Sequence, residues 1–191
     1  MANLAYDYYD DVPQEILDGK IVLMAPSPGL KHHDTIDNIK TIFKRHLKGK
    51  SCRVLGENFD VHLTENDTVI PDLMIVCSKD IIKDKGVYGA PDLIVEVLSF
   101  STAARDRNYK KNLYERCGVK EYWIVDTGNR SVEVYLLTEG KYVLDNVYIA
   151  PPDWALKTMR EEQKATLVYN FKTHLFDDMV IDIREIFEGI E

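Results

Sequence analysis

The chain has 191 residues, of which 45% are hydrophobic and 29% charged, and its formal net charge is −8. This length and composition are typical of an ordinary soluble globular protein, so we expect a single domain over residues 1–191. The acidic excess argues against broad, charge-driven adhesion to nucleic acid, because that adhesion requires many Lys and Arg side chains. Any contact with nucleic acid should therefore be local.

The sequence contains no apolar run of about 18 residues, so we expect no transmembrane helix. Its acidic start, MANLAYDYYDDVPQEI, lacks the basic and then apolar order of a signal peptide, and we expect a cytoplasmic protein. The three cysteines, Cys52, Cys77 and Cys117, are far apart and never form a CxxC pair. We therefore expect small core side chains rather than a disulfide framework or a zinc site.

The first third of the chain predicts a strand, a helix and a second strand. Residues 16–26 are interpreted as the end of a short helix, an Asp-Gly turn and a strand. Residues 28–50 predict one amphipathic helix, because apolar residues recur at helical spacing before Gly49. Residues 59–64 alternate apolar and polar side chains, which is typical of a half-exposed strand.

Two more apolar strands are predicted at 68–77 and 91–98, and we expect them to pair in the antiparallel sense. Residues 101–117 predict a helix that begins near Ser101 or Thr102 and ends at Gly118.

The remaining elements are a hairpin formed by 120–126 and 131–137, a strand pair at 141–149 and 166–171, and a terminal helix at 183–189. This order indicates an α+β or mixed α/β fold with a central sheet flanked by helices.

Glu96 stands in the middle of the apolar strand PDLIVEVLS, where an ionised carboxylate is costly unless it is paired or binds a metal. If the strands at 68–77 and 91–98 turn near residue 84, Glu96 lies opposite Asp72 on the same face of the sheet. A divalent cation between the two acids would keep both ionised. Oxygen ligands with few histidines favour Mg²⁺ or Mn²⁺ over Zn²⁺.

Each of these acids also has a purely structural interpretation. The Pro-Asp pairs that contain Asp72 and Asp92 could mark the starts of strands. Asp92 also lies roughly 13 Å along the strand from Glu96, at about 3.3 Å per residue, which is too far to share one ion directly. Glu96 itself could form a structural ion pair with Lys or Arg.

The helix at 101–117 supplies a cation. Lys110 lies four residues before Tyr114 and borders the buried side, whereas Lys111 points away. A lysine beside a metal site can orient water and stabilise the negative charge that develops on phosphate. The alternative is an ordinary ion pair of Lys110 with Asp106, four residues earlier.

The run PDLIVEVLSFSTAARDRNYKKNLYERCGVKEYWIVD, preceded by IPDLMIVC, resembles the Uma-type (Uma-two) family of restriction-endonuclease-like proteins. It is similar to the PD-(D/E)xK nuclease superfamily in a form whose lysine has moved. ILDGKIVLMAPSPGLKHH and DMVIDIREIFEG extend the resemblance over nearly the whole chain. The resemblance implies a mixed sheet flanked by helices and an endonuclease that uses Mg²⁺ on nucleic-acid phosphodiester bonds.

Carried over to this sequence, the resemblance implies that Asp72 and Glu96 are the metal-binding acids. Most of the superfamily has its lysine where this chain has Leu98, and Lys110 takes the position from which relatives with that replacement supply a lysine. The helix-opening histidine matches His33 best, with His32 as the alternative. Glu57 is a weaker candidate for an outer-shell acid.

We therefore predict metal-assisted hydrolysis, with DNA as the first candidate substrate. The predicted phosphate contacts are Arg105, Arg107 and Lys111, together with Lys110. A non-catalytic binding or assembly module on a nuclease-like scaffold is the alternative, because fold does not fix function. The aromatic residues Tyr6, Tyr8 and Tyr9 and the edge strands suggest a homodimer.

Overall fold

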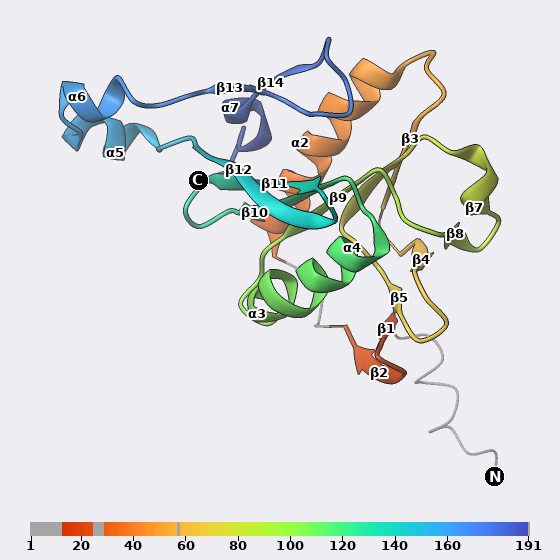
Figure 1. Ribbon diagram of the computed structural model, residues 1–191. Coiled ribbons are helices and arrows are strands. Elements are labelled where there is room, and N and C mark those ends of the chain that lie inside the picture. Colours follow the sequence, from red (N-terminus) through yellow and green to blue (C-terminus); the bar gives the residue numbers. More distant parts are fainter. Residues whose placement is uncertain (1–12, 25–28, 57, 191) are drawn as a thin grey trace.

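A computed structural model describes residues 13–24, 29–56 and 58–190 (Figure 1). In this part of the chain, two six-stranded sheets and one two-stranded sheet are present. The predicted mixed α/β architecture, a central sheet flanked by helices, is confirmed.

The central sheet carries the predicted acidic strands in its middle. Its parallel pair, β9 and β10, is joined by a helical crossover, and every other neighbouring pair is antiparallel. The strand order across the sheet is β12 (Lys141–Ile149), β11 (Ser131–Thr138), β10 (Glu121–Asp126), β9 (Leu93–Val97), β6 (Leu73–Val76) and β3 (Arg53–Gly56).

Helices cover both faces of the central sheet (Figure 1). The long helix α2 (Leu30–Leu47) and the terminal α7 (Ile183–Ile186) pack on one face, where Phe43 contacts Trp123. The crossover between β9 and β10 lies on the other face. It consists of α3 (Ala103–Arg105), a π-helical turn η2 (Asp106–Lys110) and α4 (Lys111–Cys117), and it ends at Gly118 as predicted.

The shorter helices are peripheral: η1 (Lys79–Ile81), α5 (Asp153–Thr158) and α6 (Glu161–Lys164). Among the described residues, no helix combines the length and the apolar character that crossing a membrane requires.

The second six-stranded sheet packs beside the crossover helix, and a second core forms between this sheet, α4 and the central sheet. Val61 and Val69 from the second sheet meet Met74 and Ile94 from the central sheet in that core. The strand order is β2 (Lys20–Leu23), β1 (Gln14–Leu17), β5 (Thr68–Val69), β4 (Asp60–His62), β8 (Gly86–Tyr88) and β7 (Ile82–Lys83).

The predicted helix end near residue 16 is wrong, because Gln14–Leu17 is strand β1, paired with β2. Asp18 and Gly19 form the predicted turn, both with positive φ (52° and 72°). A two-residue turn of this kind matches the twist of two antiparallel strands, so it closes a hairpin instead of ending a helix.

The predicted pairing of 141–149 with 166–171 is also wrong. β12 continues directly from β11 through a turn at Glu139 and Gly140, both with positive φ (51° and 78°), and the two strands pair along their length. The later segment forms its own small sheet from β13 (Asn170–Lys172) and β14 (Val180–Asp182). Local turn geometry therefore decided the pairing.

The cysteine prediction is corrected in the same way. Cys52 and Cys77 form a disulfide, 25 residues apart in sequence. Arg53 and Val76 are antiparallel partners, so the next residue outward on each strand brings the two cysteines together across the sheet. Cys117 is a half-buried free thiol.

Candidate metal and active site

Asp72 and Glu96 lie on the same face of the central sheet. β6 and β9 pair with Leu73 opposite Val95, and one further step of this register places Asp72 opposite Glu96, as the sequence predicted. Side chains alternate along β9: Val95 and Val97 enter the core beneath α2, while Ile94 enters the core beneath α4. Glu96 therefore faces the crossover helix.

Glu96 is only 3% exposed, and two donors from the crossover helix contact the same carboxylate oxygen. Lys110 Nζ lies 3.0 Å from Oε1, and the Tyr114 hydroxyl donates to Oε1 at 2.6 Å. Burial raises the pKa of Glu96 well above its usual value. The charge of Lys110 opposes this shift, but nearby carboxylates, Asp106 first among them, add to it.

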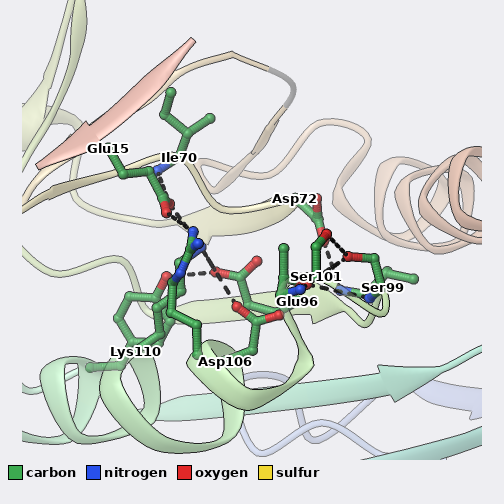
Figure 2. A network of polar contacts seen from close by, with 12 residues as sticks. Glu15, Ile70, Asp72, Glu96, Ser99, Ser101, Asp106 and Lys110 are labelled. Atoms are coloured by element: carbon green, nitrogen blue, oxygen red, sulfur yellow. Dashed lines mark hydrogen bonds and ion pairs between the residues drawn. The ribbon is translucent and has the colours of Figure 1, made fainter. Parts of the chain in front are cut away.

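Lys110 ends the π-helical turn at Asp106–Lys110, a type of irregularity that often occurs at functional sites. Its ammonium is buried and lies 2.8 Å from Glu15 Oε1, 3.0 Å from Glu96 Oε1 and 3.8 Å from Asp106 Oδ1. Figure 2 shows these three acids around the lysine. Although burial alone would lower the pKa of Lys110, the three negative charges raise it, so the side chain is an ammonium at neutral pH.

Asp72 is held by one of its two oxygens. The backbone N–H of Val97 donates to Asp72 Oδ2 at 2.7 Å, and His32 Nε2 lies 3.3 Å from the same atom. Burial would lower the pKa of His32, but the hydrogen bond and the charge of Asp72 raise it. The contact with Asp72 therefore favours the protonated form of His32.

The structure places the two adjacent histidines in different surroundings. The side chain of His33 is 63% exposed, and its Nδ1 lies 3.5 Å from Oδ1 of the neighbouring Asp34. His32 lies four residues before Ile36 and seven before Ile39, so it continues the inward stripe of α2 toward Asp72. The sequence match to a helix-opening histidine could not distinguish two adjacent histidines.

A small cavity of about 40 Å³ opens between these side chains. Space of this size can hold an ion or a few water molecules. The residues that line it are Glu15, Met24, His32, Ile70, Asp72, Glu96, Thr102, Arg105, Asp106 and Lys110. Four of them are carboxylates, against two permanent cations, so the cavity carries an excess of negative charge.

Glu15 is the site residue that the sequence interpretation missed. Its side chain comes from β1, is 1% exposed, accepts a hydrogen bond from the Ile70 backbone at 3.0 Å and contacts Arg105 and Lys110. The sequence pattern that could have identified Glu15 is the alternation of Gln14–Leu17, which as a strand buries Glu15 and Leu17 on the same face. Interpreting the segment as a helix end concealed that face.

Two of the four predicted phosphate-binding residues line the cavity, namely Arg105 and Lys110. Arg107 instead pairs with Glu133 on β11 at 2.8 Å. The Lys111 ammonium lies 3.8 Å from the centre of the Tyr135 ring, also on β11. Successive turns of the crossover helix therefore direct these cations to different surroundings.

Asp92 is not among the residues that line the cavity. Asp92 accepts a hydrogen bond from the Cys77 backbone at 2.8 Å and pairs with Lys120 at 2.7 Å, which supports its structural interpretation as a residue at a strand start. Glu57 and the aromatic residues Tyr6, Tyr8 and Tyr9 lie outside the described residues.

The donor set suits a hard divalent cation. No three His, Cys, Asp or Glu side chains within the described ranges are arranged to hold a metal ion by themselves. Mg²⁺ is commonly bound through only one or two carboxylates, with water and substrate phosphates as the other ligands. The two opposed acids fit that pattern, and Asp106 Oδ1 is buried without a hydrogen-bond partner among the described residues.

Comparisons with known proteins agree with this architecture. An uncharacterized protein of Synechocystis, slr1290, is 32% identical over 125 residues, covering 63% of this chain and 64% of its own length. The chain thus spans about two thirds of that relative.

A solved structure from Anabaena variabilis, described as "a putative nuclease belonging to DUF820", superposes with a TM-score of 0.68 at 16% identity. It covers 95% of this chain and 96% of its own and shows that the two proteins share a fold. The model of the family Uma2, described as "Putative restriction endonuclease", matches residues 4–167. This chain therefore belongs to the Uma2 family.

Proposed function

We propose that this protein is a metal-dependent endonuclease that hydrolyses phosphodiester bonds of nucleic acid, DNA in the first instance, with Mg²⁺ or Mn²⁺. The observation that carries the proposal is the placement of Asp72 and Glu96 on one face of the sheet, beside the buried ammonium of Lys110. Membership of a family described as "Putative restriction endonuclease" supports the same class of reaction.

Asp72 and Glu96 would hold the metal ion. Asp72 contacts Val97 and His32 through Oδ2, and Glu96 contacts Lys110 and Tyr114 through Oε1, so these contacts do not use Asp72 Oδ1 or Glu96 Oε2. When bound, Mg²⁺ would acidify a coordinated water and neutralise negative charge on the phosphate. Bringing a cation close would also lower the pKa of Glu96, because it reverses the repulsion among the carboxylates.

Lys110 acts as a fixed positive charge and hydrogen-bond donor. Because its pKa is raised, it holds its proton at neutral pH and does not serve as a general base. Its ammonium has three N–H donors, so it can orient a water molecule or a phosphate oxygen while retaining its contacts with the acids. Glu15 holds Lys110 from the opposite side, at 2.8 Å, and also contacts Arg105, 3.3 Å away.

The test is a cleavage assay on plasmid, linear duplex and single-stranded DNA and on RNA, with Mg²⁺ or Mn²⁺. We expect wild type to cleave at least one substrate and Glu96→Ala to lose about a thousandfold or more in rate, because it removes both a metal ligand and a partner of Lys110. The matched control is Glu121→Gln, which changes a glutamate that is equally buried on the neighbouring strand β10 but contacts Trp123 and Thr173, outside the cavity.

Metal binding gives an independent measurement. Titration with Mn²⁺, followed by electron paramagnetic resonance, should show a site in wild type and in Glu121→Gln that is lost in Glu96→Ala. A folded wild-type protein that binds nucleic acid but cleaves none of the four substrates with either metal would refute the endonuclease and leave the non-catalytic module.

A further inference from the structure

A second hollow lies at the C-terminal end of α2, whereas His32 lies near the N-terminal end of this helix. It has a volume of about 350 Å³ and is formed by the C-terminal end of α2 and the edge strand β3. Its floor contains the buried Leu47 and the half-buried Val54 and Leu55. We call it the basic groove and define it by its lining residues Lys44, Leu47, Lys48, Cys52, Arg53, Val54 and Leu55.

Three exposed cations are among the residues that line this groove, namely Lys44, Lys48 and Arg53. None of them pairs with a carboxylate among the residues that the structure describes. Their neighbours behave differently, because Arg45 pairs with Glu185 at 2.7 Å and Lys50 pairs with Asp178 at 3.1 Å. In a chain with a net charge of −8, a groove with three uncompensated cations is suited to an anionic ligand.

Strand β3 connects the groove with the neighbourhood of the candidate metal site. This strand pairs with β6, and Gly56 at its end lies so close to Asp72 that an added Cβ would be 2.4 Å from the Asp72 carbonyl oxygen. Arg53, at the other end of β3, lies opposite Val76, four residues beyond Asp72. At about 3.3 Å per residue, Arg53 lies roughly 13 Å along the sheet from the acid, which is about four nucleotides at 3.4 Å each.

We propose that the basic groove binds the phosphate backbone of the nucleic acid a few nucleotides away from the bond placed at Asp72 and Glu96. This inference rests on the proposed function for its ligand class. A second copy of the chain is a poorer occupant, because a two-fold contact through the groove would bring the two sets of cations together. Phosphate groups spaced along a strand match the charge of the groove.

The experiment compares two triple charge reversals with the same change in net charge. The groove variant is Lys44→Glu, Lys48→Glu and Arg53→Glu. The control variant is Lys79→Glu, Lys83→Glu and Lys85→Glu, which reverses exposed lysines of η1, β7 and the turn before β8. Binding of a fluorescent 20-base-pair duplex is measured by anisotropy in EDTA, so that cleavage cannot contribute.

We expect the groove variant to lose at least tenfold in affinity at 100 mM salt and the control variant to lose less than threefold. The slope of log affinity against log salt should fall by about 2–3 in the groove variant, at about 0.9 for each lost phosphate contact. A neutral version, Lys44→Gln, Lys48→Gln and Arg53→Gln, should show a smaller loss in the same direction. Thermal unfolding of every variant checks that each one is folded.

Three outcomes would contradict the proposal that the groove binds nucleic acid. They are equal losses of duplex affinity in the groove and control variants, no binding of the duplex by wild type, and displacement of the duplex from wild type by polyglutamate as effectively as by unlabelled duplex. A change in sedimentation mass caused only by the groove variant would assign the surface to self-association instead. Binding that depends on the groove without cleavage under any metal condition would refute the endonuclease but support the groove, so the two proposals fail separately.

Discussion

Two buried carboxylates, Asp67 and Glu96, show how one residue class can serve stability or form a candidate site. Asp67 lies in the turn between β4 and β5 and is 4% exposed, almost the same as Glu96 at 3%. Burial would raise the pKa of Asp67, but four donors lower it: the Asp18 N–H, the Tyr109 hydroxyl, the Thr64 hydroxyl and the Arg116 guanidinium.

Glu96 has the opposite balance. It has two donors, Lys110 and Tyr114, and its pKa rises because it is buried among other acids. The comparison shows that burial alone does not mark a functional acid. A candidate functional acid is distinguished by having few hydrogen-bond donors and little positive charge around it. Glu96 has such surroundings, whereas Asp67 does not.

The largest effect that we expect from the difference between Glu96 and Asp67 is on the cleavage rate. Lys110→Met keeps the length of the side chain but removes the ammonium, and we expect a fall in cleavage rate of about 10²–10³-fold. The rate is measured by single-turnover cleavage, with Lys111→Met as the matched control because Lys111 lies over Tyr135. A Lys110→Met protein that is as active as wild type would reduce Lys110 to a structural ion pair.

Next in size is the effect of Asp67→Asn on stability. The amide cannot accept all the hydrogen bonds that the carboxylate accepts, so we expect a loss of about 2 kcal/mol in the free energy of unfolding. Cleavage per folded molecule should stay at the wild-type level. Denaturant unfolding and the cleavage assay together check both parts, and lost activity in a fully folded Asp67→Asn protein would contradict the division between the two acids.

The sign of the pH dependence should also separate the two acids. The pKa of Asp67 is lowered on folding, so its stabilisation is complete above the ordinary value of 3.8 and is lost as the pH falls through the folded pKa. The pKa of Glu96 is raised, so its ionisation opposes folding as the pH rises above 4.5. Without metal, Glu96→Gln should therefore gain stability relative to wild type with rising pH, whereas Asp67→Asn approaches wild type at low pH.

The smallest expected effect concerns the two histidines. His32→Ala removes the partner of Asp72 at 3.3 Å, and we expect about a tenfold fall in cleavage rate, since a misplaced acid weakens metal binding. His33→Ala should have no effect, because that side chain is exposed and distant from the cavity. Equal rates for the two variants would remove His32 from the site.

The sequence was informative wherever a pattern repeats along one element. The alternation of residues 91–98 and their register with 68–77 were sufficient to place Glu96 opposite Asp72. Helical spacing likewise located α2 and the crossover helix with Lys110 on its inner side. These predictions succeeded because the periodicity of a strand or helix determines which residues share a face.

Predictions failed where the result depended on segments distant in the sequence. Glu15 joins the candidate site only because β1 pairs with β5, which precedes Asp72. The disulfide between Cys52 and Cys77 depends on the pairing of β3 with β6, across 25 residues. Neither pairing leaves a local signal in the sequence.

By itself, then, the sequence determined the two opposed acids, the lysine on the next helix and the mixed α/β class, because local periodicity encodes each of them. Only the tertiary structure decided which histidine meets Asp72, that Glu15 completes the acidic cavity, and that Arg107 and Lys111 face β11 instead. The physical reason is that charge balance in a buried site is summed over elements that meet only when the whole chain has folded.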